Sequence, residues 1–341
     1  MRGKGIAYDT GFINAGVSTR EHFVPDVVRR EMRVIRDDLH CTAVRITGGD
    51  PDRLEIAARH AADAGLEVWY SPFTCGLTPD ELLVLIADCA ERAERLRREG
   101  ADVVLVTGSE MSLFNVGFLP GETLEERLGL MAAPERLREA LPLVPGRVND
   151  FLGKAVAVVR ERFGGKVSYA SLPFEGVDWT PFDIIASDAG YRAPEIAHRF
   201  RDDIRAFVAQ GKPAAVTEFG CATFRGAADL GGRGASIVEW GEDGRAVRVN
   251  GDYVRDEREQ VAYLREVLDV FEAEGVDTVF WTAFASYHLP HRDEARGDLD
   301  MASYGVVKVL EGRLGEAYPD MPWEPKAVFE VLADRYRGGS S

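Results

Sequence analysis

The sequence contains few cysteines and no long apolar run. Only four cysteines occur among 341 residues, and none stands in a Cys-x-x-Cys or other metal-binding spacing. In a chain of this size, such cysteines indicate reduced thiols in a cytoplasmic protein. No stretch of about 18 apolar residues is present, so we expect no transmembrane helix. Strand-like sequence begins soon after Met1, without the longer apolar run that a signal peptide requires.

An excess of positive charge is also missing. The chain has 41 lysines and arginines against 57 acidic residues, which gives a formal net charge of −16. Proteins that bind nucleic acids or anionic membranes carry basic patches, so we expect neither as a partner. Most of the acidic excess is typical of a solvated surface. The sequence does not indicate an oligomeric state.

Motifs for cofactors and metals are absent too. Neither Gly-x-Gly-x-x-Gly nor His-x-His follows the first apolar run. The six histidines include one cluster, His288 and His291 with Asp293, but Pro290 argues against a single helical face there. We therefore expect no bound cofactor and no metal ion.

One unit recurs along the chain: an amphipathic helix, often a glycine, then a short apolar run. Glycine ends a helix in the left-handed conformation, and apolar runs without alternation indicate strands buried on both faces. The expected strands cover residues 4–8, 42–47, 66–70, 103–106, 166–170, 183–186, 214–217 and 278–281. Eight such units predict a (β/α)8 TIM barrel, with residues 1–341 as a single domain. A doubly wound open sheet is the alternative.

Two long insertions interrupt this pattern, at residues 111–149 after the fourth strand and 220–253 after the seventh. Within the second, 235–240 and 245–249 flank a Glu-Asp-Gly turn, which predicts a β-hairpin. The glycine-rich run 231–234 favours a mobile lid over a phosphate-binding loop.

Two glutamates follow apolar strands on roughly opposite sides of the predicted barrel. Glu110 follows the fourth strand, and Glu218 ends the seventh. Active sites of such barrels lie at the C-terminal ends of the strands, and burying a carboxylate there is costly unless it is paired or used. Glycoside hydrolysis requires two facing carboxyl groups. The alternative is that each glutamate forms a salt bridge at the rim.

The motifs around these glutamates resemble those of the clan A glycoside hydrolases. Thr217-Glu218-Phe219-Gly220 is similar to the nucleophile motif of that family, and Thr107-Gly108-Ser109-Glu110 to its acid/base motif. The resemblance implies that Glu218 is the nucleophile and Glu110 the acid/base. Where the family usually has Asn in contact with the 2-hydroxyl of the sugar, this chain has Ser109.

The same resemblance implies further binding residues. Arg45 matches the arginine that supports the nucleophile, and Tyr191 the tyrosine that hydrogen-bonds it. Trp281 matches an aromatic platform on the eighth strand, and we expect Trp281 and Trp69 to stack on sugar faces. The remaining expected substrate contacts are Ser109, Tyr8 and His288.

These residues predict a retaining glycosidase or transglycosidase that acts on a small carbohydrate or glycoside. Glu218, kept ionised by Arg45 and Tyr191, attacks the anomeric carbon. Glu110, with a raised pKa, protonates the leaving oxygen and then activates water. Two alternatives remain: a catalytically silent barrel that binds a sugar or a partner protein, and a lyase or isomerase that uses both glutamates as acid and base.

Overall fold

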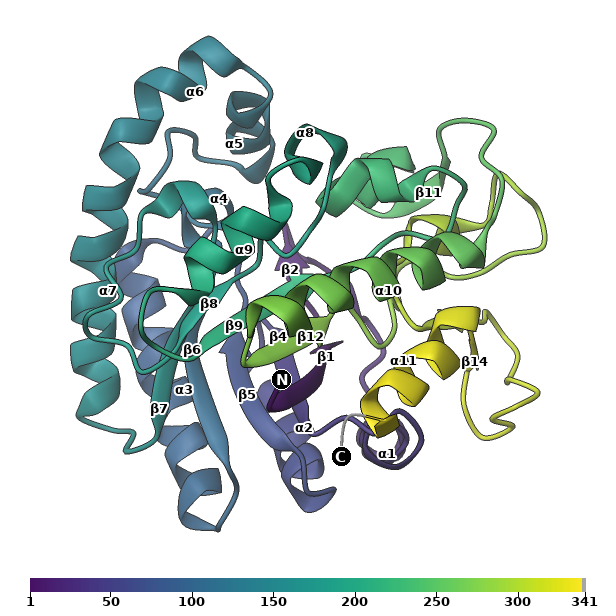
Figure 1. Ribbon diagram of the computed structural model, residues 1–341, viewed down its shortest axis with the longest axis horizontal. Helices are drawn as coiled ribbons and strands as arrows, with labels where there is room; N and C mark the ends of the chain where they lie inside the picture. Colours follow the sequence, from purple (N-terminus) through teal and green to yellow (C-terminus); the bar gives the residue numbers. More distant parts are fainter. Residues whose placement is uncertain (339–341) are drawn as a thin grey trace.

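Eight parallel strands close into a barrel in the computed structural model, which describes residues 1–338 (Figure 1). The barrel strands are β1 (Gly3–Asp9), β4 (Ala43–Gly48), β5 (Glu67–Pro72), β6 (Val103–Ser109), β7 (Lys166–Ser171), β8 (Ile185–Ser187), β9 (Ala214–Phe219) and β12 (Thr278–Trp281). Their order is β1-β12-β9-β8-β7-β6-β5-β4, and β1 pairs with both β12 and β4. The predicted TIM barrel is therefore confirmed, and the open sheet is wrong.

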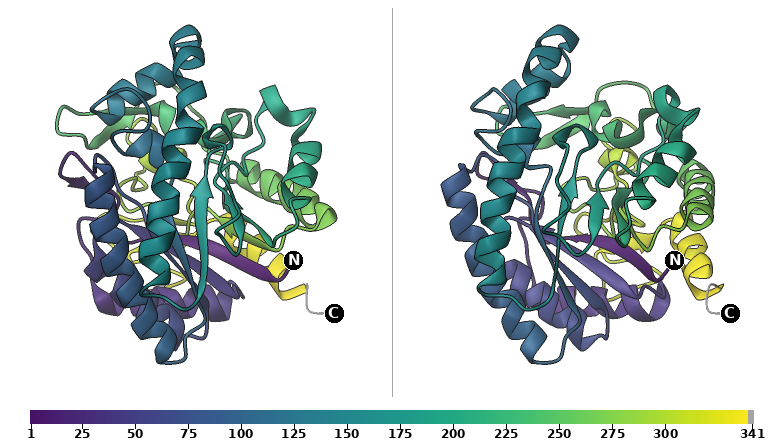
Figure 2. Two further views of the ribbon diagram at one scale, coloured as in Figure 1. Left: turned by 90° about the vertical axis from the view of Figure 1, so that its left-hand side faces the viewer. Right: turned by 60° about the vertical axis from the view of Figure 1, so that its left-hand side comes forward.

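Helices surround the barrel on the outside (Figures 1 and 2). They are α1 (Pro25–Arg33), which continues into η1 (Val34–Asp38), α2 (Pro51–Asp63), α3 (Pro79–Arg98), α7 (Val144–Arg160), α8 (Pro194–Ala197), α9 (Phe200–Val208), α10 (Glu257–Glu274) and α11 (Ala327–Gly338). Local signals fix their ends. Asp50 caps α2, and Thr78 and Glu81 form a capping box on α3. Gly275, with φ +79°, ends α10.

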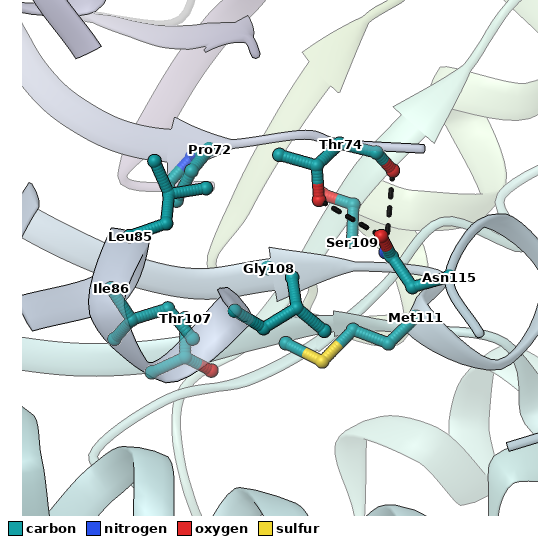
Figure 3. A pocket seen from close by; sticks show the side chains of 10 residues that line it. Pro72, Thr74, Leu85, Ile86, Thr107, Gly108, Ser109, Met111 and Asn115 are labelled. Atoms are coloured by element: carbon teal, nitrogen blue, oxygen red, sulfur yellow. Dashed lines mark hydrogen bonds between the residues drawn. The ribbon is translucent and has the colours of Figure 1, made fainter. Parts of the chain in front are cut away.

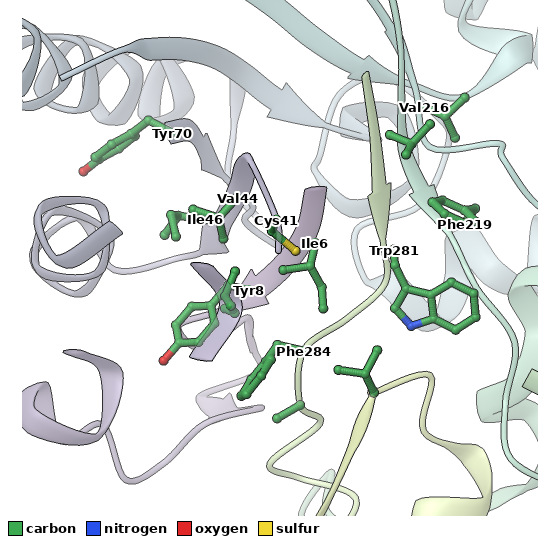
Figure 4. Close-up of a cluster of buried hydrophobic side chains, with 14 of the residues drawn as sticks. Ile6, Tyr8, Cys41, Val44, Ile46, Tyr70, Val216, Phe219, Trp281 and Phe284 are labelled. Atoms are coloured by element: carbon green, nitrogen blue, oxygen red, sulfur yellow. The ribbon is translucent and has the colours of Figure 1, made fainter. Parts of the chain in front are cut away.

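Two apolar cores lie on the two faces of the barrel wall. The outer core fills the space between strands and helices (Figure 4). The inner core consists of alternate strand residues: Ala43, Trp69, Val104, Val106, Ala170, Ile184, Ala186, Ala215 and Phe280. The rings of Trp69 and Phe280 lie 5.0 Å apart although β5 and β12 are not neighbours, so they meet across the interior. Because strand side chains alternate in direction, six of the eight barrel strands, all except β1 and β8, contribute to both cores.

The first insertion is helical, with α4 (Met111–Phe114), α5 (Leu124–Met131), α6 (Pro134–Ala140) and η2 (Leu141–Leu143). Helices α5 and α6 stand beyond one end of the barrel (Figures 1 and 2). The expected insertion extends too far, because α7 already begins at Val144.

The second insertion contains η4 (Ala227–Ile237) and an antiparallel hairpin of β10 (Val238–Trp240) and β11 (Ala246–Val249). The predicted hairpin is confirmed, but its first strand begins at Val238. Residues 235–237 belong to the preceding helical segment instead.

Shorter elements follow the ends of other barrel strands. They are β2 (Ile13–Asn14) and β3 (Val17–Ser18) after β1, η3 (Pro173–Glu175) after β7, and η5 (Leu299–Ala302), β13 (Val307–Val309) and β14 (Trp323–Pro325) after β12. Among the helices of residues 1–338, none is long and apolar enough to cross a membrane.

Candidate active site

Arg45 lies at the centre of the polar cluster above the inner core. It belongs to β4 and is completely buried. Its guanidinium donates to five partners: Asp188 Oδ1 at 2.8 Å, the Thr217 carbonyl at 2.9 Å, Glu218 Oε1 at 3.2 Å, Ser71 Oγ at 3.2 Å and Ser109 Oγ at 2.5 Å. Arginine suits this position because its planar fork of N–H donors serves several acceptors at once. One side chain thus joins the ends of β5, β6 and β9 to the residue that follows β8.

Glu218 accepts two hydrogen bonds near the end of β9. Arg45 binds Oε1, and the Tyr191 hydroxyl donates to Oε2 at 3.2 Å. Burial raises the pKa of Glu218 to about 8, and the negative charge of Asp188 adds to this increase. Arg45 and Tyr191 oppose it by stabilising the ionised carboxylate. The structure therefore brings Arg45, Tyr191 and Glu218 into the contacts that the sequence resemblance implies.

Glu110 has different surroundings. It follows β6 in a left-handed backbone conformation, with φ +44°, and its backbone N–H donates to the Ala170 carbonyl at 2.9 Å. Burial raises the pKa of the Glu110 carboxyl well above its ordinary value. The negative charges of Asp188, Glu218 and Glu175 raise it further. A raised pKa favours the protonated carboxyl group, which is the form that can donate a proton.

A third carboxyl group, Glu175, supports the segment that carries Glu110. It is fully buried and accepts hydrogen bonds from Ser112 N and Oγ at 3.1 and 2.7 Å, Tyr169 Oη at 2.9 Å and Leu172 N at 2.8 Å. The Tyr169 hydroxyl also accepts from Met111 N at 2.9 Å. Because Met111 and Ser112 directly follow Glu110, this network holds the backbone of the acid/base candidate.

Asp188 is the residue of this cluster that sequence reasoning did not select. It follows the short strand β8, its side chain is fully buried, and it forms the shortest ion pair of Arg45. Burial raises the pKa of Asp188, while Arg45 lowers it. The signal was present in the sequence, since an acidic residue follows an apolar run here as it does at Glu110 and Glu218.

The glycine-rich segment 231–234 packs against the tyrosines beside Glu218. The Tyr304 hydroxyl accepts from Gly234 N and donates to the Gly231 carbonyl, both at 2.6 Å. The rings of Tyr304 and Tyr191 lie 6.0 Å apart. A Cβ atom on Gly232 would lie 3.4 Å from the Tyr191 ring, an ordinary contact distance. A Cβ atom on Gly234 would lie only 2.6 Å from Tyr304 Oη, so the close approach there depends on glycine. The expected lid thus contacts the tyrosine that binds Glu218.

Three expected substrate contacts lie elsewhere. Trp69 is fully buried in the inner core, and its indole N–H donates to Glu67 Oε1 at 2.6 Å, at the opposite end of β5. Trp281 is fully buried in the outer core, where its ring lies 5.4 Å from that of Phe219 (Figure 4). Tyr8 also points into the outer core and donates to buried Glu31. All three side chains are fully buried in this structure, which does not favour the predicted contacts with a sugar.

The other two expected substrate contacts, Ser109 and His288, lie in different parts of the site. Ser109 is 2% exposed, and its hydroxyl accepts from Arg45, so it lies below the surface of the mouth. His288 lies in the loop after β12, with its ring 6.4 Å from that of Trp240. Burial lowers the pKa of His288, and the negative charge of Asp9, at the end of β1, opposes this decrease.

A small pocket lies behind the segment that carries Glu110 rather than at the mouth (Figure 3). It is bounded by the ends of β5 and β6 and by Leu82 and Ile86 of α3. At one side, Asn115 Nδ2 donates to the Thr74 carbonyl at 3.2 Å. The pocket therefore belongs to the packing between barrel wall and helix. Within residues 1–338, no group of three histidine, cysteine, aspartate or glutamate residues could hold a metal ion.

Solved structures of glycosidases share this fold. A GH113 β-mannanase from Alicyclobacillus acidocaldarius superposes with a TM-score of 0.59 at 16% identity, over 98% of this chain and 97% of that one. Thermotoga maritima Cel5A, in complex with cellobiose, gives 0.51 at 13% identity over 89% and 96%. A Bacteroides uniformis β-glucuronidase gives 0.58 at 12% identity, and 99% of this chain covers 35% of that larger protein. No family model and no curated protein sequence matches the chain. At these identities the likeness is one of fold, and the barrel is the one that the sequence resemblance implies.

Proposed function

We propose that this protein is a retaining glycoside hydrolase with Glu218 as nucleophile and Glu110 as acid/base. The observation that carries the proposal is the unequal environment of the two carboxyl groups at one barrel mouth. Burial raises the pKa of both groups, but hydrogen bonds from Arg45 and Tyr191 stabilise the ionised form of Glu218, whereas the negative charges of Asp188, Glu218 and Glu175 raise the pKa of Glu110 further. Acid-assisted glycoside cleavage requires one carboxyl group that reacts as the carboxylate and one that donates a proton.

In the proposed mechanism, ionised Glu218 attacks the anomeric carbon while Glu110 donates its proton to the leaving oxygen. Arg45 and Tyr191 orient Glu218 and offset the cost of its ionisation in a buried site. Once the leaving group departs, Glu110 is ionised and accepts a proton from the water that attacks the glycosyl–enzyme bond. Glu175 and its donors keep the Glu110 backbone in place through both steps.

A sugar is the substrate class that fits this chemistry. The structures with the same fold include a β-mannanase, a β-glucuronidase and a complex with cellobiose. The panel that tests the proposal therefore contains 4-nitrophenyl β-mannosides, β-glucosides, β-glucuronides and β-galactosides, together with the corresponding oligosaccharides.

The decisive comparison uses Glu218→Gln, Glu110→Gln and the exposed Glu135→Gln on α6 as a matched control. We expect Glu218→Gln to abolish hydrolysis of every substrate. Glu110→Gln should slow the hydrolysis of oligosaccharides far more than that of 4-nitrophenyl glycosides, because 4-nitrophenolate leaves without a proton. Glu135→Gln should behave as the wild type. Full activity of Glu218→Gln would overturn the proposal.

The same panel separates the two alternatives. A catalytically silent barrel would bind a sugar of the panel without turnover. A lyase would release a product with a new carbon–carbon double bond, and an isomerase would release no 4-nitrophenolate at all. Neither alternative has an observation of its own in its favour.

A further inference from the structure

The β10–β11 hairpin carries an exposed tryptophan at Trp240. Its side chain is 50% exposed, whereas Trp69, Trp281 and Trp323 are fully buried. An indole is a large apolar group, so leaving it half exposed gives up much of the stabilisation that its burial would provide. Exposed aromatic surface is typical of a ligand site. The flat face of an indole matches the C–H face of a pyranose ring.

The hairpin lies against the loop that follows β1 instead of projecting freely. Arg245, beside its turn, pairs with Glu21 at 2.5 Å. A Cβ atom at Gly244 would lie 3.5 Å from the Val17 side chain. At the other end of the hairpin, Val249 N donates to the Arg296 carbonyl at 2.9 Å. These contacts hold the hairpin that carries Trp240 against the loops that follow β1 and β12.

His288 faces Trp240 from the loop after β12. The two rings are 21° from parallel, with centroids 6.4 Å apart. The His288 Nδ1 atom is buried and has no hydrogen-bond partner among residues 1–338. A buried nitrogen without a hydrogen-bond partner is destabilising, and a ligand hydroxyl would provide the missing partner. An exposed aromatic face and an unpartnered polar nitrogen therefore occur side by side.

The order of the strands places this pair on one side of the two glutamates. Going round the barrel from β6 with Glu110, one reaches β9 with Glu218 and then β12 and β1. Trp240 and His288 lie over the last two strands, beyond Glu218. Since Glu110 protonates the leaving group in the proposed function, the side beyond Glu218 holds the sugar that is retained on the enzyme and the rings attached to it.

We propose that Trp240 and His288 form a subsite for a pyranose ring of the glycone, with the indole stacked on the ring and His288 bonded to a ring hydroxyl. That the ring belongs to the glycone rests on the proposed function. The binding of a sugar by Trp240 and His288 does not. The subsite predicts a preference for donors with more than one sugar ring.

Isothermal titration calorimetry with manno- and cello-oligosaccharides, from disaccharide to pentasaccharide, tests the binding. We expect the wild type to bind at least one of these series, and Trp240→Ala and His288→Ala to weaken that binding about tenfold. The control is Val247→Ala, because Val247 is 52% exposed on β11 of the same hairpin. It should bind as the wild type does. Equal affinity of Trp240→Ala and wild type, or no binding of any member by the wild type, would overturn the subsite.

Kinetics on 4-nitrophenyl glycosides with one or two sugar rings test the assigned side. Trp240→Ala should reduce kcat/KM for the two-ring donor about tenfold and leave the one-ring donor nearly unchanged. An equal loss for both would overturn the glycone placement. If the wild type hydrolyses neither donor but its oligosaccharide binding still depends on Trp240, the proposed function fails while the sugar subsite stands.

Discussion

Arg45 Nη1 lies 3.2 Å from Glu218 Oε1, although the two residues are 173 positions apart in the sequence. The same nitrogen lies closer to Asp188 Oδ1, at 2.8 Å. One guanidinium therefore balances two carboxyl groups, and Glu218 receives only part of its positive charge. Burial is the main cause of the raised pKa of Glu218, and the negative charge of Asp188 adds to it, so the pKa stays raised despite the arginine partner.

The pH dependence of kcat/KM should respond to Asp188. The acidic limb reports ionisation of the nucleophile, because activity is lost as Glu218 becomes protonated. The negative charge of Asp188 raises the pKa of Glu218, so Asp188→Asn should move this limb to lower pH by about one unit. Tyr191→Phe removes a hydrogen bond that lowers the same pKa and should move the limb to higher pH. Shifts in the same direction for both variants would contradict the assignment.

The alkaline limb should respond to Glu175. It reports loss of the proton from Glu110, whose pKa is raised by the charge of Glu175. Glu175→Gln removes that charge, so the pKa of Glu110 falls and the limb should move to lower pH. Ser112→Ala serves as the comparison, since it deletes one hydrogen bond to Glu175 and retains the carboxylate. An alkaline limb that stays in place in Glu175→Gln would show that Glu175 does not act on Glu110 through its charge.

Ser109 is expected to act on Arg45 rather than on the sugar. Its hydroxyl accepts from Arg45 Nη2 at 2.5 Å, and without it this nitrogen retains only Asp188 Oδ2 at 3.4 Å. Ser109→Ala should therefore lower the free energy of unfolding by about 1–3 kcal/mol, measured by urea titration. The KM for the best substrate of the panel should stay unchanged. A raised KM with unchanged stability would instead show that Ser109 touches the substrate.

The largest loss of stability is expected at Glu31, far from the proposed chemistry. This fully buried carboxylate accepts from Arg20 and Trp323, both at 2.9 Å, and from the hydroxyls of Tyr8 and Tyr287. Glu31→Ala leaves the buried Arg20 guanidinium unpaired and should cost about 3–5 kcal/mol of unfolding free energy. Asp88→Ala, which removes a surface partner of Arg92, should cost at most about 1 kcal/mol. Similar losses for both variants would contradict this account.

The barrel could be predicted because its signals are local and repeated. Each apolar run and each glycine-terminated helix can be recognised within a few residues. Only a few folds are compatible with parallel strands that alternate regularly with helices. The two glutamates could be found for the same reason, since a carboxylate directly after an apolar strand is unusual. The segment after β12 does not show this repeated pattern of helix and strand. Its strands β13 and β14 depend on pairing with each other and on packing against Glu31 through Trp323.

The direction of individual side chains could not be read from the same patterns. Runs that are apolar on both faces do not reveal which residues point into the barrel. Phe280 belongs to the inner core, so alternation places Trp281 in the outer core. Trp69 does point inward, but β5 continues to Pro72, so its ring lies well below the mouth. The exposed tryptophan of the mouth, Trp240, comes from an insertion whose position depends on tertiary contacts.

Covalent trapping tests the central claim most directly. A 2-deoxy-2-fluoro glycoside with a good leaving group, of the sugar preferred in the panel, slows hydrolysis of the glycosyl–enzyme more than its formation. Peptide mass spectrometry of the inactivated protein should find the sugar on Glu218. A label on Glu110 or another residue, or turnover that inverts the anomeric configuration without any label, would contradict the account.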